Sequence, residues 1–168
     1  MSVPQPLNAN TQSEITTMDI VHRIGIKAPA SKVYAALSTI DGLAGWWTKD
    51  TTGASKVGDH IAFRFHTAAG DEIGGFGMDV LELTPDEKVR WRVKDGPPEW
   101  VGTDVEFLLS REDDYTIVMF GHRKWRKEAE FMAHCSTKWA TFLLSLRDLV
   151  ETGEGKPSPN DLQISNWH

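Results

Sequence analysis

Cysteine is almost missing from this sequence of 168 residues, which contains only Cys135. A single thiol excludes an intramolecular disulfide and any CxxC metal or redox pair, and it is typical of a cytoplasmic protein. Long apolar runs are missing as well: none approaches the roughly 20 residues that cross a bilayer, so we expect no membrane insertion. The N-terminus lacks the basic flank and apolar stretch of a secretory signal.

Positive charge is also scarce. The chain has 18 Lys and Arg against 24 Asp and Glu, which leaves a net charge of −6. Nucleic-acid binders usually carry a basic face, so this balance argues against a nucleic-acid partner and against binding to anionic membranes. No HxxxH or HExxH spacing predicts a metal site, and Gly74–Gly77 lacks the lysine and helix of a phosphate loop. We therefore expect no cofactor and no metal.

Aromatic residues are what the chain has in quantity: seven Trp and seven Phe, but only two Tyr. The length indicates one domain, since domains cluster near 100–200 residues. Residues 1–14 are polar, contain two prolines and have no periodicity, which predicts a disordered leader. The periodic patterns extend over residues 15–151. Residues 152–168 form a tail that carries three apolar residues, Leu162, Ile164 and Trp167.

The N-terminal part of the domain predicts a strand followed by short helices. Residues 20–26 alternate apolar and polar side chains, as a strand does, in a pattern that starts near Thr16. Ser31 then suits the N-cap of a helix with apolar residues at steps of three and four. Asp41–Gly42 predicts its end, and residues 43–47 fit one or two further helical turns. The segment 48–59 predicts a loop with room for a short edge strand.

Five strand patterns follow, at residues 60–66, 75–83, 89–93, 101–109 and 115–122, and the short turns between them predict an antiparallel meander. Which side of the strand at residues 75–83 points to the core is left open, because apolar residues occur at both alternating sets of positions. Asp104 and Glu106 alternate with apolar residues, so we expect both on the solvated side. A long amphipathic helix is predicted over residues 127–150, with an apolar stripe of Phe131, Cys135, Trp139, Phe142, Leu146 and Leu149.

This order of elements predicts an α+β fold in which a curved antiparallel β-sheet wraps around the long C-terminal helix. It resembles the helix-grip fold of the START-like, or SRPBCC, superfamily over about residues 16–150, with Ala28–Tyr34 opening the first helix. Trp46–Trp47, Gly121–His122 with Trp125, and Cys135–Ser136 with Trp139 resemble the Hsp90 ATPase activator-like branch. The resemblance implies a fold with a pocket for a small molecule or lipid. It does not imply co-chaperone activity, because the eukaryotic co-chaperones carry a further Hsp90-binding domain.

We expect a hydrophobic or aromatic small molecule, or a lipid, to bind in a cavity between the sheet and the last helix. Inward aromatic residues carry this prediction, and His122 would add a polar group to the site. The alternative is that the rings simply fill the core. Whether Trp46 and Trp47 both point inward is left open. The predicted ligand-binding residues are Trp46, Phe63, Phe65, Met78, Trp91, Phe107, His122, Trp125, Phe131, Cys135 and Trp139.

Two other functions remain open. The first is an enzyme of the polyketide cyclase or hydrolase kind, with His122 and Tyr34 or Tyr115 as proton carriers. Cys135 is not a candidate nucleophile, because it falls on the apolar stripe of the helix, where we expect it to be buried and unreactive. The second is a chaperone-related protein-interaction module with an exposed apolar patch, in which the tail takes part. The tail would equally suit docking on its own domain or pairing with a second copy in a homodimer.

Overall fold

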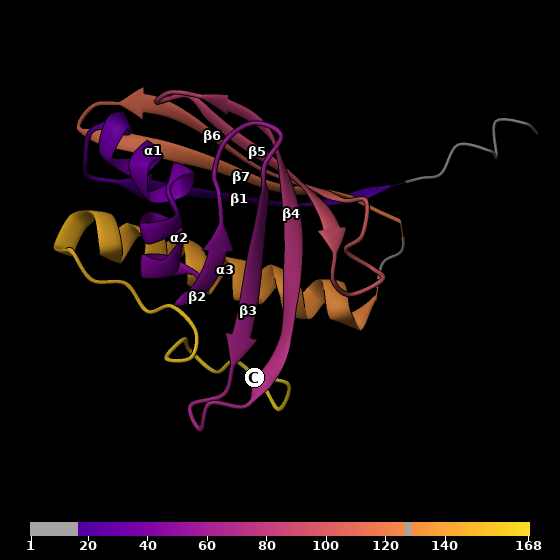
Figure 1. Ribbon diagram of the computed structural model, residues 1–168. Helices are drawn as coiled ribbons and strands as arrows, with labels where there is room; N and C mark the ends of the chain where they lie inside the picture. Colours follow the sequence, from indigo (N-terminus) through magenta and orange to yellow (C-terminus); the bar gives the residue numbers. More distant parts are fainter. Residues whose placement is uncertain (1–16, 127–128) are drawn as a thin grey trace, which may run out of the picture.

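The computed structural model describes residues 17–126 and 129–168 (Figure 1). The predicted leader, residues 1–14, and the strand start at Thr16 lie outside the described residues. Within these residues, three helices and seven strands follow one another. They are β1 (Met18–Ile26), α1 (Ala30–Ser38), α2 (Ile40–Trp46), β2 (Asp50–Gly53), β3 (His60–His66), β4 (Glu72–Thr84), β5 (Lys88–Asp95), β6 (Asp104–Glu112), β7 (Tyr115–Trp125) and α3 (Glu130–Thr152).

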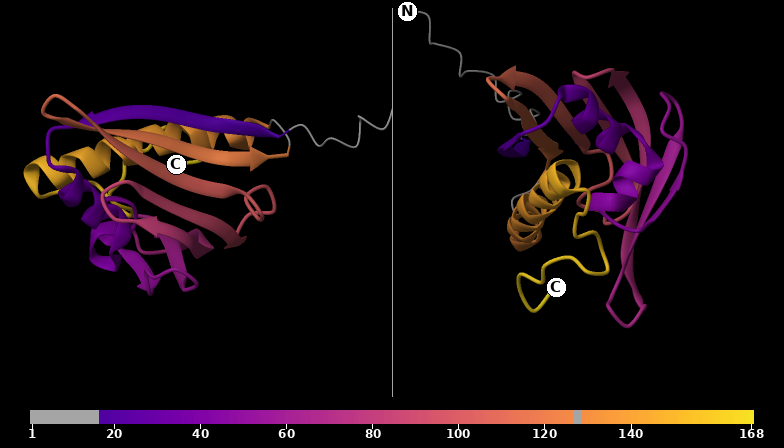
Figure 2. Two further views of the ribbon diagram at one scale, coloured as in Figure 1. Left: turned by 90° about the horizontal axis from the view of Figure 1, so that it is seen from above. Right: turned by 90° about the vertical axis from the view of Figure 1, so that its left-hand side faces the viewer.

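The strands form one antiparallel sheet in the order β1-β7-β6-β5-β4-β3-β2. The right-hand view of Figure 2 shows α3 nearly end-on, with the curved sheet around it. The α+β helix-grip prediction is therefore confirmed, as are the five-strand meander (β3 to β7) and the short edge strand, β2. In the described residues no helix combines the length and the apolar character needed to cross a membrane.

The two short helices differ in detail from the prediction. α1 starts one residue before Ser31, and its N-cap position is Pro29, which offers no capping side chain. The break between the helices falls at Thr39 rather than at Asp41–Gly42. Thr39 caps α2 by accepting a hydrogen bond from the Gly42 amide at 3.0 Å. Gly42 sits so close to α1 that a Cβ there would lie 2.6 Å from the Ala36 Cα.

Irregular register explains why the facing of residues 75–83 was ambiguous. The pairing of β4 with β5 shifts between Gly77 and Met78 and again between Val80 and Glu82. Each shift interrupts the strict alternation of faces. Met78 and Val80, two residues apart, lie in the core. The second shift leaves Leu81 out of the pairing, and beyond it Leu83 pairs with Val89 and packs against the core.

The expectation that Asp104 is exposed to solvent is wrong. Its side chain does lie on the face of β6 opposite the core residues, but only 4% of it is exposed. Arg90, Arg92 and Lys124 from the neighbouring strands cover it, at 2.8, 2.9 and 3.0 Å. Glu106 is also partly covered, by Arg123. In addition, Val101 lies in the turn before β6, which starts at Asp104.

Aromatic rings from both layers fill the space between α3 and the sheet. The predicted apolar stripe of α3 faces inward: Cys135, Trp139, Phe142 and Leu146 are buried. Phe131 and Leu149 at its ends pack against the core and are partly buried. The largest fully buried rings are Trp46, Trp47, Trp91, Trp125, Trp139, Phe63, Phe107 and Phe120. Trp46 and Trp47 therefore both point into the core.

Candidate functional site

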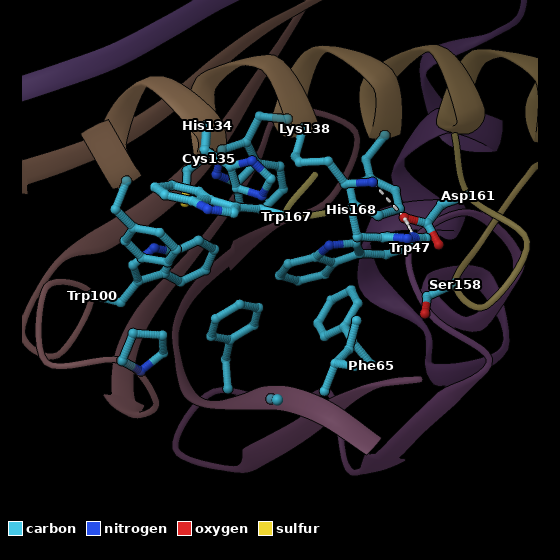
Figure 3. Close-up of a pocket in the computed structure, with 18 residues that line it drawn as sticks. Trp47, Phe65, Trp100, His134, Cys135, Lys138, Ser158, Asp161, Trp167 and His168 are labelled. Carbon is cyan, nitrogen blue, oxygen red and sulfur yellow. Dashed lines mark hydrogen bonds and ion pairs between the residues drawn. The ribbon is translucent and has the colours of Figure 1, made fainter. Parts of the chain in front are cut away.

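One end of the gap between α3 and the sheet is not filled by side chains. A pocket of about 270 Å³ opens there (Figure 3). It is bordered by β3 and β4, the turn before β6, the N-terminal half of α3 and the C-terminal tail. Its lining residues are Trp47, Phe65, Ile73, Gly74, Gly75, Phe76, Pro97, Trp100, Phe131, His134, Cys135, Lys138, Trp139, Phe142, Ser158, Asp161, Trp167 and His168.

Flat rings in nearly parallel planes form the walls of this pocket. Phe76 and Trp100 stack with centroids 3.9 Å apart and an interplanar angle of 6°. Trp139 lies 5.9 Å from Trp100 at 16°. Trp47 lies 6.1 Å from Phe76 at 18°, so the stack extends to a fourth ring. Apolar walls with aligned aromatic faces suit a flat apolar ligand.

Two successive glycines of β4, Gly74 and Gly75, line the pocket on the sheet side. Gly74 has a φ of +148°, a conformation that favours glycine. Gly75 lies against β3, where a Cβ would come within 2.5 Å of the Phe63 carbonyl oxygen. Both positions therefore require glycine for backbone reasons, and β4 borders the pocket there with its backbone alone.

The C-terminal tail forms another wall and is anchored to the body of the protein. The Ser158 amide donates to the Trp47 carbonyl at 2.8 Å, and the Ser158 carbonyl accepts from the Lys49 amide at 3.0 Å. Further along, Asp161 pairs with Lys138 of α3 at 2.5 Å. Trp167 packs edge-on against His134, with ring centroids 5.4 Å apart. The tail therefore docks on its own domain.

Polar groups at the pocket gather on the side of α3 and the tail. Burial lowers the pKa of His134, and the nearby positive charges of Lys138 and His168 lower it further. Burial raises the pKa of the Cys135 thiol to about 12, so this cysteine stays protonated and unreactive near neutral pH. The described residues contain no group of His, Cys, Asp and Glu side chains arranged to hold a metal ion.

Comparison of the sequence with known protein families identifies the family of this chain. Residues 27–151 match the family described as Activator of Hsp90 ATPase homolog 1-like protein. The chain belongs to this family. No curated protein matches it.

Solved structures show relatives of this family. The chain is 46% identical to a protein from Colwellia psychrerythraea whose solution structure is described as an Aha1 dimer, with a TM-score of 0.74. That comparison covers 82% of this chain and 99% of the other. A protein from Mesorhizobium loti (18% identity, TM-score 0.66, 79% and 96% covered) and CalU16 from Micromonospora echinospora (19%, 0.63, 82% and 78%) share the fold.

The eleven predicted ligand-binding residues divide into two groups in this member of the family. Four of them, Phe65, Phe131, Cys135 and Trp139, line the pocket together. The other seven are buried in the closed part of the core and do not border the pocket. These are Trp46, Phe63, Met78, Trp91, Phe107, His122 and Trp125. For them the core-filling interpretation describes what the structure shows.

His122 is part of a buried hydrogen-bond chain rather than of the pocket. Its Nδ1 accepts from the Trp139 indole N–H at 3.1 Å, and its Nε2 lies 2.8 Å from the Thr103 hydroxyl. The Thr103 hydroxyl in turn donates to the Trp100 carbonyl. Burial lowers the pKa of His122 to about 3, an effect that the charge of Asp104 opposes only in part. His122 therefore orients Trp139 and Trp100, two of the rings that line the pocket.

Sequence reasoning missed several lining residues. Two of them could have been found from the sequence. Phe142 lies on the predicted apolar stripe of α3, and Trp47 was considered as an inward-pointing residue, although its direction was left open. Trp100 follows a Gly-Pro-Pro turn, where periodicity says nothing about direction. Lys138 is a polar residue of α3, and Asp161 lies in the irregular tail. They come together only because the tail docks on the domain, which no sequence pattern predicts.

Proposed function

We propose that the protein binds an apolar or aromatic small molecule in the pocket between α3 and the end of β3 and β4. The observation that carries this proposal is the cluster of stacked rings, Trp47, Phe76, Trp100 and Trp139, that lines an unfilled volume. A void in a protein core forfeits contacts, so closely aligned rings around an empty space support a site rather than a packing defect.

The volume favours a small ligand. Pockets for drug-sized molecules span roughly 300 to 1,000 Å³, and this one holds about 270 Å³. A molecule with one or two fused rings suits this space better than a sterol or a long-chain lipid. The ligand would enter beside the tail, where Trp167 is 47% exposed.

The test is a titration with 2-methoxynaphthalene, a neutral two-ring probe, followed by NMR of the seven indole N–H signals. We expect the signals of Trp100 and Trp139 to shift. The Trp46 signal is an internal control, because its indole N–H donates to the Ala36 carbonyl at 2.9 Å in the closed core. Equal shifts of all indoles, or no saturable change, would refute the proposal.

The geometry gives little support to an enzyme that uses His122. His122 is buried and held in its neutral form, and neither Tyr34 nor Tyr115 borders the pocket. Tyr115 lies at the start of β7, 38% exposed, with the ammonium of Lys27 5.4 Å from its ring centroid. The three predicted proton carriers are therefore not brought together around this cavity.

We also propose that the chain forms a homodimer. Its support is the 46% identical relative from Colwellia psychrerythraea, which is described as a dimer. Val21, Leu108 and Met119 are exposed on the outer face of β1, β6 and β7, where the register places Leu108 opposite Met119. Sedimentation velocity over a concentration series tests this: a mass that stays at one chain at every concentration contradicts it.

A further inference from the structure

We propose that the pocket selects molecules that carry a neutral hydrogen-bond donor, such as a phenolic hydroxyl, on a flat apolar body, and that Asp161 accepts this hydrogen bond. The inference rests on the proposed binding function and names the chemistry of the ligand. Three features of the described residues carry it: an unpaired carboxylate oxygen, the charge around it and the rings on the other side of the pocket.

The carboxylate of Asp161 is buried but only half satisfied. Its side chain is 4% exposed and borders the pocket. Oδ2 accepts a hydrogen bond from Lys138 Nζ at 2.5 Å and lies 3.2 Å from His168 Nε2. Oδ1 is equally buried, yet no group in residues 17–126 or 129–168 donates to it. A buried acceptor without a donor is costly, so a bound molecule that supplies a donor there gains affinity.

The neighbouring charges restrict what kind of donor fits. The Lys138 side chain is 13% exposed, and its Nζ also donates to the Leu162 carbonyl at 2.8 Å. A cationic ligand at Asp161 would approach this ammonium and be repelled by it. An anionic ligand would be repelled by the carboxylate. A neutral hydroxyl avoids both penalties.

The shape of the pocket places the apolar part of such a ligand away from Asp161. In Figure 3, Trp100 and Asp161 lie on opposite sides of the view, with Trp47 nearer to Asp161. Phe76 stacks on Trp100, and Trp47 and Phe65 continue the apolar lining of the pocket. A flat ring system that reaches from these rings toward the tail would present its substituent to Asp161.

The first experiment compares 2-naphthol with 2-methoxynaphthalene on the full chain at neutral pH, by isothermal titration calorimetry. The two probes share a ring system and an ether or hydroxyl oxygen, but only 2-naphthol has a donor. We expect 2-naphthol to bind about 10-fold more tightly or better, as for hydrogen bonds to charged groups. Equal affinities would show that the ligand hydroxyl does not bind to Oδ1 and would overturn the inference while leaving the proposed function intact. Binding of neither probe would remove the proposed function itself.

The second experiment removes the buried pair as a unit, with Lys138→Met and Asp161→Leu combined, because a single apolar substitution leaves an uncompensated charge. We expect the preference for 2-naphthol to disappear and the affinity for 2-methoxynaphthalene to remain. Glu154→Gln, a change at an exposed carboxylate of the same tail, is the matched control and should keep the preference.

A third variant, Asp161→Asn, keeps the shape of the side chain and provides the measurement if the double variant does not fold. Its neutral amide oxygen is a weaker acceptor, so the preference for 2-naphthol should fall. A preference that survives unchanged in either variant would exclude Asp161 as the acceptor and overturn the inference.

Discussion

Hydrogen bonding determines which tautomer of His122 the core contains. Because Nδ1 accepts from the Trp139 indole, the proton of the neutral ring sits on Nε2. Nε2 then donates to Thr103 Oγ1, and the Thr103 hydroxyl in turn donates a hydrogen bond to the Trp100 carbonyl. One buried side chain thus holds two rings of the pocket at fixed positions.

Burial of His122 makes the stability of the protein depend on pH. Its pKa is lowered from 6.5 to about 3 in the folded protein. As the pH falls below 6.5, the unfolded chain takes up a proton that the folded protein does not, so stability is lost. This contribution amounts to at most about 1.4 kcal/mol per pH unit. Urea unfolding at pH 7.5, 6.5 and 5.5 should show a smaller loss for His122→Gln than for the wild type. Parallel profiles would contradict the assignment.

Asp104 depends on its three cationic neighbours. Burial alone would raise its pKa, but hydrogen bonds from Arg92, Arg90 and Lys124 outweigh burial and hold the pKa well below its usual range. We expect Asp104→Asn to lower the free energy of unfolding by about 1–3 kcal/mol at neutral pH, since it leaves three cations unpaired. Asp114→Asn is the matched control: its side chain is 72% exposed and 3.9 Å from Lys27. Equal effects of the two substitutions in chemical denaturation would refute the prediction.

At the scale of the element, the two ends of α2 have different roles. Thr39 ends α1 and caps α2 at once, so one residue forms the junction between the two helices. Trp46 is the last residue of α2, and Trp47 stands at its C-cap with its amide bonded to the Leu43 carbonyl. The end of α2 thus falls between the two successive indoles, and both point inward.

Removal of this cap should be measurable. We expect Thr39→Ala to lower the free energy of unfolding by about 1 kcal/mol, the usual cost of losing an N-cap side chain. Thr137→Ala, at an exposed position inside α3, is the control and should stay within about 0.5 kcal/mol of the wild type. Equal free energies of unfolding for the two variants, measured by thermal or urea unfolding, would contradict this prediction and show that the Gly42 amide finds another acceptor.

At the scale of the whole molecule, the aromatic residues have two separate roles. Phe107 is fully buried in the closed core, whereas Phe76 is partly buried and lines the pocket. Phe107 was a predicted ligand-binding residue and Phe76 was not, but the structure places Phe107 in the packed part of the core and Phe76 at its open end. The open end is bordered by Gly74 and Gly75 of β4, by the N-terminal half of α3 and by the C-terminal tail.

Two substitutions separate these roles. Phe107→Ala should cost about 3–5 kcal/mol of unfolding free energy because it opens a cavity in a packed region. Phe76→Ala should cost less, since the ring is partly exposed, but should weaken binding of 2-methoxynaphthalene. Leu108→Ala, on the outer face of β6, should leave binding unchanged. Unaltered probe affinity in Phe76→Ala would place the ligand elsewhere.

The order and type of the elements were predictable because they depend on local periodicity. The alternating strands and the stripe of α3 follow from repeats of two and of three to four residues. The details that failed, such as the helix break at Thr39 and the buried Asp104, depend on neighbours. Asp104 alternates with apolar residues as a surface residue would, and only the arginines of β5 and the lysine of β7 cover it.

The sequence by itself determined the layers of this protein: a curved sheet, an aromatic-rich helix across it and one unreactive cysteine. Periodicity and composition suffice for that, because each element must bury its apolar face. Only the tertiary structure decided where the aromatic packing stops and a pocket begins. That depends on which side chains meet from distant segments, Trp100 from a turn, Trp47 from a helix cap and Asp161 from the tail, and no local pattern encodes such meetings.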